Sequence, residues 1–306
     1  MVAIAALEQQ QLDEQQWRQL LVNGSVFLLA DPTLNEAVRG IAESQLPETP
    51  EFNRLYWGEL GRLHASLSPC LIRAHGSNWA ELQQKICSQP GWGMAWVLEG
   101  DMQAYTPLQQ LQLLVHHLRS WTWIADGDDT QLLRIADWKV AETLLSASSV
   151  EEAVDFLGPA AALVTINADG ITRWQPKQRS QWLLAQQSTP RVLTDPQYQA
   201  LRQMAEAITY RDYMTHLQQH HPVTRQWSTD DCLSFISKHV NQAQQHGFSG
   251  KQQQIKFLTL ACLFGDDFCQ LPWAKSILDA PRQGAEDRMY KLFRAAEAEL
   301  DKEVAS

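Results

Sequence analysis

The sequence predicts an α+β protein, in which a mixed α/β amino-terminal domain with a mixed sheet is followed by an all-α helical carboxy-terminal domain. Short runs rich in β-branched and aromatic residues recur up to position 174 and alternate with segments of helical spacing. Beyond position 196 these strand signals stop and only helical patterns continue. We therefore expect a first domain at 1–175, a linker or bridging stretch at 176–196, and a helical bundle at 197–306.

Several runs in the first domain have the composition of β-strands. They are 26–31, 70–75, 94–100, 120–125 and 131–137. Most of them are separated by segments that carry helix start signals, at 32–45, 78–88 and 107–119. This alternation of strands and helices predicts a mixed or partly parallel sheet.

Two turns in the first domain require antiparallel neighbours. The string DGDDT at 126–130 is too short for a helix, so the strands on either side of it run antiparallel. A second hairpin is indicated at 161–174, where Asn167 to Gly170 supply residues that tolerate positive φ. We expect this hairpin to close the first domain.

The second domain shows helical patterns that begin or end at residues with a capping role. Ser228 can cap a helix start, and Gly247 and Gly265 can end helices in the left-handed conformation. The predicted helices are 197–220, 228–246, 250–264, 272–280 and 284–303. Together they predict a small helical bundle.

The distribution of charge limits the possible partners. The net charge is −10, and up to position 178 Asp and Glu outnumber Lys and Arg by 21 to 11, whereas 14 of each follow. An acidic domain repels nucleic acid and anionic membranes and attracts a basic protein surface. No apolar stretch approaches the roughly 18 residues that span a bilayer, and the opening lacks the features of a secretory signal. We expect no nucleic-acid partner, no membrane insertion and a cytoplasmic location.

The motifs of common catalytic and metal sites are missing from the sequence. The five cysteines form an odd set without a CxxC pair, which predicts buried thiols. The Gly-Lys step at 250–251 lacks the spacing of a phosphate loop, and the adjacent histidines at 116–117 and 220–221 do not have the i, i+4 spacing that favours chelation. We therefore expect no catalytic, cofactor-binding or metal-binding residues, and no enzyme. An unrecognised hydrolase or transferase with a spatially assembled site stays open as an alternative, as does a structural or regulatory module.

A series of short strings occurs in a particular order between positions 18 and 160. The strings are Asp31 after an apolar strand, Leu55-Tyr56, Pro69-Cys70-Leu71, Trp92-Gly93, Leu118-Arg119 and Arg134-Ile135-Ala136-Asp137. In these strings the chain resembles the type VI secretion effector chaperones, the Tap/Tec adaptors, whose conserved amino-terminal domain has long been of unknown function. The resemblance implies a non-catalytic adaptor that binds a cognate toxic effector protein and helps to load it onto the VgrG spike protein.

The chain also resembles the helical tail of these adaptors and departs from their pattern at one place. A Gly-x-x-Phe step precedes a Pro-Trp-Ala turn in many of them, and here these are Gly265, Phe268 and Pro272-Trp273-Ala274. After Asp137 the family usually continues with Pro-Arg, whereas this chain has Trp138-Lys139. Lysine keeps the charge of arginine but loses its bidentate geometry.

Tryptophan residues beside predicted turns or helix starts are the best candidates for exposed anchors at a protein interface. They are Trp57, Trp138 and Trp273, and we add Lys139 because it stands where the chain departs from the family pattern. We expect these four residues to bind protein partners. Other aromatic residues are expected to fill the core between sheet and helices, namely Tyr56, Trp92, Trp96, Trp121 and Trp123. The apolar neighbours of Trp273 favour a core position for it as well.

Overall fold

The computed structural model of the protein describes residues 4–23, 25–44, 52–178, 190–280 and 284–305. By its internal contacts the chain divides into two compact units, Met1–Arg202 and Gln203–Ser306. The first unit contains all the described strands and the second is helical, so the predicted fold class is confirmed. The domain boundaries predicted at 175 and 197 stay predictions, and part of the stretch 176–196 lies outside the described residues.

A seven-stranded sheet forms the centre of the first unit, with the spatial order β1-β9-β8-β5-β2-β4-β3. The strands are β1 (Leu7–Leu12), β2 (Val26–Ala30), β3 (Phe52–Arg54), β4 (Cys70–Ala74), β5 (Gly93–Val97), β8 (Ala162–Asn167) and β9 (Gly170–Pro176). All five residues of β2 are buried, because this central strand has neighbours on both sides and helices over both faces. This burial explains its continuous apolar run.

Neighbouring strands run antiparallel in every described pair of this sheet, although the alternation of strands and helices predicted some parallel pairing. The reason lies in the position of β2, which pairs with both β4 and β5. The helical connection from β4 to β5 therefore joins two strands of the same direction that are not neighbours. A helix between two strand signals does not show which strand lies between them in space.

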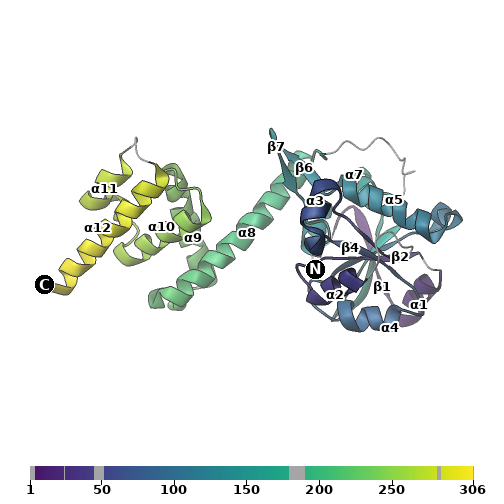
Figure 1. Cartoon of the computed structure of the whole chain (residues 1–306). Helices are drawn as coiled ribbons and strands as arrows, with labels where there is room; N and C mark the ends of the chain where they lie inside the picture. Colours follow the sequence, from purple (N-terminus) through teal and green to yellow (C-terminus); the bar gives the residue numbers. More distant parts are fainter. Residues whose placement is uncertain (1–3, 24, 45–51, 179–189, 281–283, 306) are drawn as a thin grey trace. The chain divides into compact units, whose positions relative to one another are not determined.

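Helices cover both faces of the sheet (Figure 1). On one face lie α1 (Glu14–Val22), α2 (Glu36–Ser44) and α4 (Trp79–Leu82), which continues into a π-helical turn (Gln83–Cys87). On the other face lie α5 (Pro107–Ser120), α6 (Trp138–Ser146) and α7 (Val150–Leu157). The ring of Trp96 in β5, for example, lies 5.7 Å from that of Phe156 in α7, centroid to centroid. The short helix α3 (Gly58–Leu63) follows β3 and has no buried residue.

The two predicted hairpins are present. Asn167 pairs with Gly170 at the β8–β9 turn, and β6 (Trp123–Asp126) pairs with β7 (Asp129–Leu132) around the DGDDT string. These last two strands form a separate two-stranded sheet, and residues 133–137 are not in a strand, so the strand predicted at 131–137 is correct only at its start.

Arg191, which lies near the carboxy-terminal end of the predicted linker, contacts several other parts of the first unit. The Arg191 backbone N–H donates to the carbonyl oxygen of Trp123 (2.9 Å), and the Arg191 guanidinium lies 4.5 Å from the ring centroid of Trp121. The guanidinium also forms an ion pair with Asp155 (2.7 Å). The carboxy-terminal end of the predicted linker is therefore held in place by specific contacts.

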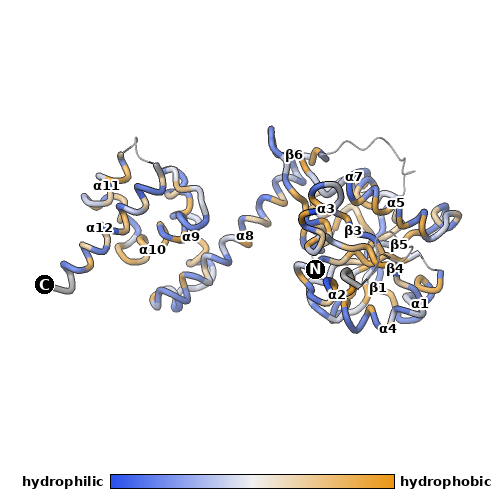
Figure 2. The backbone as a smooth tube through the Cα atoms, in the orientation of Figure 1, coloured by the Kyte–Doolittle hydropathy of each residue, from blue (hydrophilic) through white to orange (hydrophobic). Residues whose placement is uncertain are grey.

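The helices of the second unit match the predicted ones closely. They are α8 (Asp195–His220), which begins in the first unit, α9 (Thr229–Gln245), α10 (Lys251–Phe264), α11 (Pro272–Leu278) and α12 (Ala285–Ala305). Hydrophilic and hydrophobic residues alternate along α12, and its buried face includes Met289, Leu292 and Ala296 (Figure 2). Within the described part of the chain, no helix has the length and apolar character needed to cross a membrane.

Candidate protein-binding surface

Several strands begin or end at one edge of the sheet. Ala30, the last residue of β2, pairs with the first residues of β4 and β5, Cys70 and Gly93. Because β3 and β8 run antiparallel to β4 and β5, their carboxyl ends lie at the same edge. Residues that follow β2 and β3, precede β5, or form the β8–β9 turn therefore meet there. We call this surface the Asp31 edge.

Asp31 organises this edge through a buried carboxylate. Its Oδ1 accepts hydrogen bonds from the backbone N–H and the hydroxyl of Thr33 (2.7 and 2.6 Å), and its Oδ2 accepts one from the Arg134 guanidinium (3.1 Å). The Asp31 side chain is only 4% exposed, so these charge-assisted bonds offset the cost of removing it from water. They also hold the segment around Arg134 at the edge. Burial, with a smaller contribution from the charge of Asp31, raises the pKa of the nearby Tyr56 hydroxyl.

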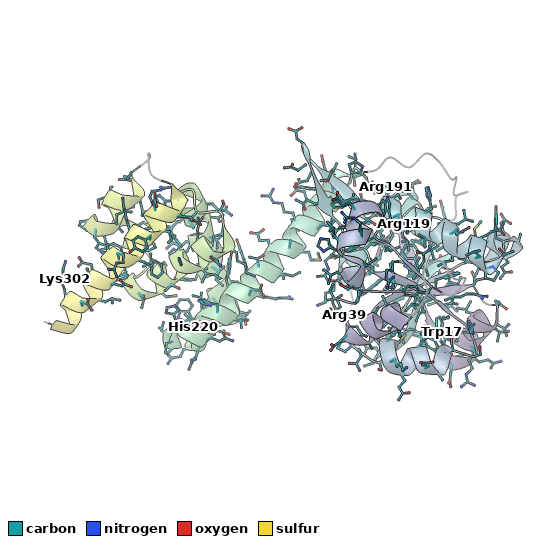
Figure 3. The ribbon with its side chains drawn as sticks, in the orientation of Figure 1. Trp17, Arg39, Arg119, Arg191, His220 and Lys302 are labelled. Atoms are coloured by element: carbon teal, nitrogen blue, oxygen red, sulfur yellow. The ribbon has the colours of Figure 1, made fainter. Side chains whose placement is uncertain are left out.

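Trp57 lies at the start of α3 with its ring supported from one side. Arg119, which Figure 3 labels, lies at the end of α5. Its guanidinium lies 5.5 Å from the Trp57 ring centroid. Arg119 also donates hydrogen bonds to the carbonyl oxygens of Arg54 (3.0 Å) and Leu55 (3.1 Å). The Trp57 residue is 38% exposed, so a well-positioned aromatic ring remains accessible to a partner.

A groove of about 660 Å³ opens at the same edge, and we call it the Trp138 groove. Its walls are the loop after the π-helical turn, the first turn of α6 and the β8–β9 turn. The Trp92 indole N–H donates to the carbonyl oxygen of Ile166 (3.0 Å) and so joins the first wall to the third. Asp137 accepts the backbone N–H of Lys139 (3.0 Å), which caps α6 and fixes the second wall.

The structure brings three of the four predicted binding residues to the Asp31 edge. Trp138 and Lys139 line the groove, with Trp138 half-buried and its ring centroid 5.6 Å from that of Trp174. Trp57 lies at the end of β3. Trp273 belongs to the second unit, where it is half-buried and packs edge-to-face on Phe264 (5.1 Å between ring centroids). The role of these four residues in binding stays a prediction.

Sequence reasoning did not identify the other groups at this edge. Asp169 lines the groove from the β8–β9 turn, and the only sequence signal for it was its place in a predicted hairpin. Arg134 was recognised as part of a string, yet its ion pair with Asp31 joins residues 103 positions apart. Only the folded chain shows that these residues are neighbours.

Two buried cysteines of the first unit have thiols that stay protonated. Burial raises the pKa of the Cys70 and Cys87 thiols to about 12, so both are protonated and unreactive at neutral pH. Among the described residues, no three His, Cys, Asp or Glu side chains are placed to hold a metal ion together. What the Asp31 edge offers is an aromatic ring, a groove and exposed charges, which are the components of a binding surface.

A comparison with known protein families matches the part of the chain that contains most of this surface. Residues 26–154 match the family model described as Domain of unknown function (DUF4123). Neither the curated proteins nor the solved structures contain a match to the chain. The matched segment runs from the first residue of β2 into α7, so it includes Asp31, Trp57, Trp138 and Lys139. The match covers 129 of the 306 residues, all of them in the first unit.

Proposed function

We propose that the protein is a non-catalytic type VI secretion adaptor, which binds a cognate toxic effector in the cytoplasm and helps to load it onto the VgrG spike protein. One observation carries the proposal: the segment that matches DUF4123, a domain associated with such adaptors, also contains most of the Asp31 edge. The same segment supplies the exposed ring of Trp57 and two of the three walls of the Trp138 groove.

The physical character of the Asp31 edge supports binding. The Trp57 ring is held by Arg119, and the groove walls are fixed by the hydrogen bonds of Trp92 and Asp137. Groups that are already held in place lose little conformational entropy when a partner binds. The edge is therefore preorganised, as is typical of a surface that must recognise a specific protein.

The two units also differ in charge, as an adaptor with two partners requires. The first unit, Met1–Arg202, contains 22 acidic against 14 basic residues, whereas the second unit contains 13 acidic against 11 basic residues. Two surfaces of different charge can select two different partners. We propose that the effector and the VgrG spike bind to different units.

Co-expression tests the adaptor function. The chain is produced together with the protein encoded beside its gene, purified without nucleotide or metal, and analysed by size-exclusion chromatography with light scattering. We expect one peak with the mass of a complex, and a second complex when the neighbouring VgrG protein is added. Two separate peaks at micromolar concentration, with the adjacent protein folded, would contradict the proposal.

A further inference from the structure

The charges around the Trp138 groove are unevenly balanced. Asp137 and Asp169 line the groove, and neither forms an ion pair with another residue in the described parts of the chain. Lys139 also lines the groove, but the carboxylate of Glu142 follows it one turn later in α6. Burial raises the pKa of Glu142, and the positive charge of Lys139 is among the smaller effects that oppose this rise. The groove therefore presents more negative than positive charge to a partner.

The groove also has an apolar side. The half-buried side chains of Trp138 and Ile166 line the groove, together with the buried side chain of Trp92. Trp138 is held from behind by Trp174, so its ring is positioned before a partner arrives. A volume of about 660 Å³ falls within the range of natural binding pockets and can hold a few side chains of a peptide.

We propose that the Trp138 groove binds a short segment of the effector in which a lysine or arginine lies beside an apolar side chain. This assignment rests on the proposed adaptor function. The apolar side chain packs against Trp138 and Ile166, and the cation lies near the carboxylates of Asp137 and Asp169. The acidic charge of the whole first unit adds a long-range attraction that brings a basic segment toward the groove.

Two charge reversals in matched positions test the proposal. Asp169 and Asp128 are both exposed, each in the two-residue loop of a hairpin, but only Asp169 lines the groove. Asp169→Lys and Asp128→Lys change the net charge equally. Affinity for the protein encoded beside this gene is measured by calorimetric titration at low and at high salt. We expect Asp169→Lys to weaken binding about five-fold or more at low salt and Asp128→Lys to change it less than about two-fold.

A third variant fixes the sign of the partner's charge. Lys139→Glu removes the groove's exposed cation, so a basic segment should bind more tightly and an acidic segment more weakly. Circular dichroism and thermal melting confirm that each variant is folded. Weaker binding by Lys139→Glu, or equal effects of the two aspartate reversals, would overturn the assignment of the groove. Failure of the unaltered chain to bind would instead overturn the adaptor function on which it rests.

Discussion

Replacement of Gly93 by alanine tests how closely β2 and β5 approach each other at the Asp31 edge. Gly93 opens β5 opposite Ala30 with a φ of +131°, a conformation that residues with a side chain rarely adopt. A Cβ atom at this position would lie 1.9 Å from the carbonyl oxygen of Leu29. Leu29 is a buried residue of the central strand, and its backbone cannot turn aside as a flexible side chain could.

The expected loss of stability has two components. The backbone conformation costs a residue with a side chain about 1–3 kcal/mol. Relief of the contact must move β2 and β5 apart locally and weaken the hydrogen bonds between them, each worth about 1 kcal/mol net. We therefore expect Gly93→Ala to lower the free energy of unfolding by roughly 3–5 kcal/mol, a large part of the total for an ordinary domain.

A neighbouring glycine provides the control. Gly91 has a φ of +72°, and a Cβ atom there would have no atom within 4 Å, so Gly91→Ala bears only the conformational cost of about 1–2 kcal/mol. Unfolding in urea, followed by tryptophan fluorescence and by circular dichroism, measures both variants. A loss for Gly93→Ala no larger than that for Gly91→Ala would refute the close approach of the two strands.

Three further predictions concern the interior of each unit. Trp273→Ala should lower the free energy of unfolding by about 2–4 kcal/mol, because the indole packs on the bundle core. As a control, replacement of the exposed Tyr290 by alanine should change the free energy of unfolding by less than about 0.5 kcal/mol. Equal losses for the two variants would contradict the packing of Trp273. Burial raises the pKa of Cys70 and Cys87 to about 12, so a thiol reagent near pH 8 should label these two residues only after unfolding. Rapid labelling of Cys70 or Cys87 in the folded chain would contradict their burial. Burial and, to a smaller extent, two neighbouring histidines lower the pKa of His221 below 6.5, so the unfolded state binds a proton at this residue at a higher pH than the folded state does. Thermal melting should therefore show that stability declines below about pH 6.5, and that it declines less in His221→Gln. The same pH profile in the variant as in the unaltered chain would refute the assignment.

Elements whose start and end signals are local could be predicted from the sequence. At the start of α5, Thr106 accepts the backbone N–H of Gln109 and the Gln109 side chain accepts that of Thr106, with Pro107 in the first turn. The β8–β9 turn and the helices of the second unit are likewise set by residues within a few positions of one another. These interactions leave a pattern that can be read from a single sequence.

Elements that depend on distant partners could not be predicted. Strand β1 pairs with β9 along its whole length, and the Gln11 side chain donates to the Thr172 hydroxyl 161 positions away. Only one residue of its segment, LEQQQL, is fully buried, so the segment lacks the apolar alternation that marks a strand. The three-residue β3 is too short to show any period. Both strands exist because their neighbours supply the hydrogen-bond partners.

Two tryptophans at the candidate surface could be named from the sequence, but its other residues and its geometry could not. Tryptophan beside a turn is a usable signal, and Trp57 and Trp138 both prove accessible at one edge of the sheet. Trp273 has the same sequence context, yet it packs on Phe264 and the bundle core. The difference arises because the exposure of a side chain depends on which helices pack around it. The local sequence does not determine this packing.

The strings behind the family resemblance mainly build the Asp31 edge. The carbonyl oxygen of Trp92 accepts the backbone N–H of Asp31, Arg119 binds two carbonyl oxygens at the end of β3, and Asp137 caps α6. The first two of these contacts join backbone segments that are far apart in the sequence. A chain that forms this edge needs these contacts whatever partner it binds, so they indicate the fold.

The exposed groups at the same edge have a different role. The side chains of Lys139 and Asp169 make no contact that α6 or the β8–β9 turn requires, since the backbone N–H groups there are bonded to Asp137 and Asn167 instead. Their charge can therefore change without much cost to the fold. On the proposed adaptor function, a relative with a different effector can keep every backbone-fixing residue and have a groove of the opposite charge. The choice of cargo should then follow the groove's charge, and Asp169→Lys with Lys139→Glu exchanges these charges while the net charge of the chain stays the same.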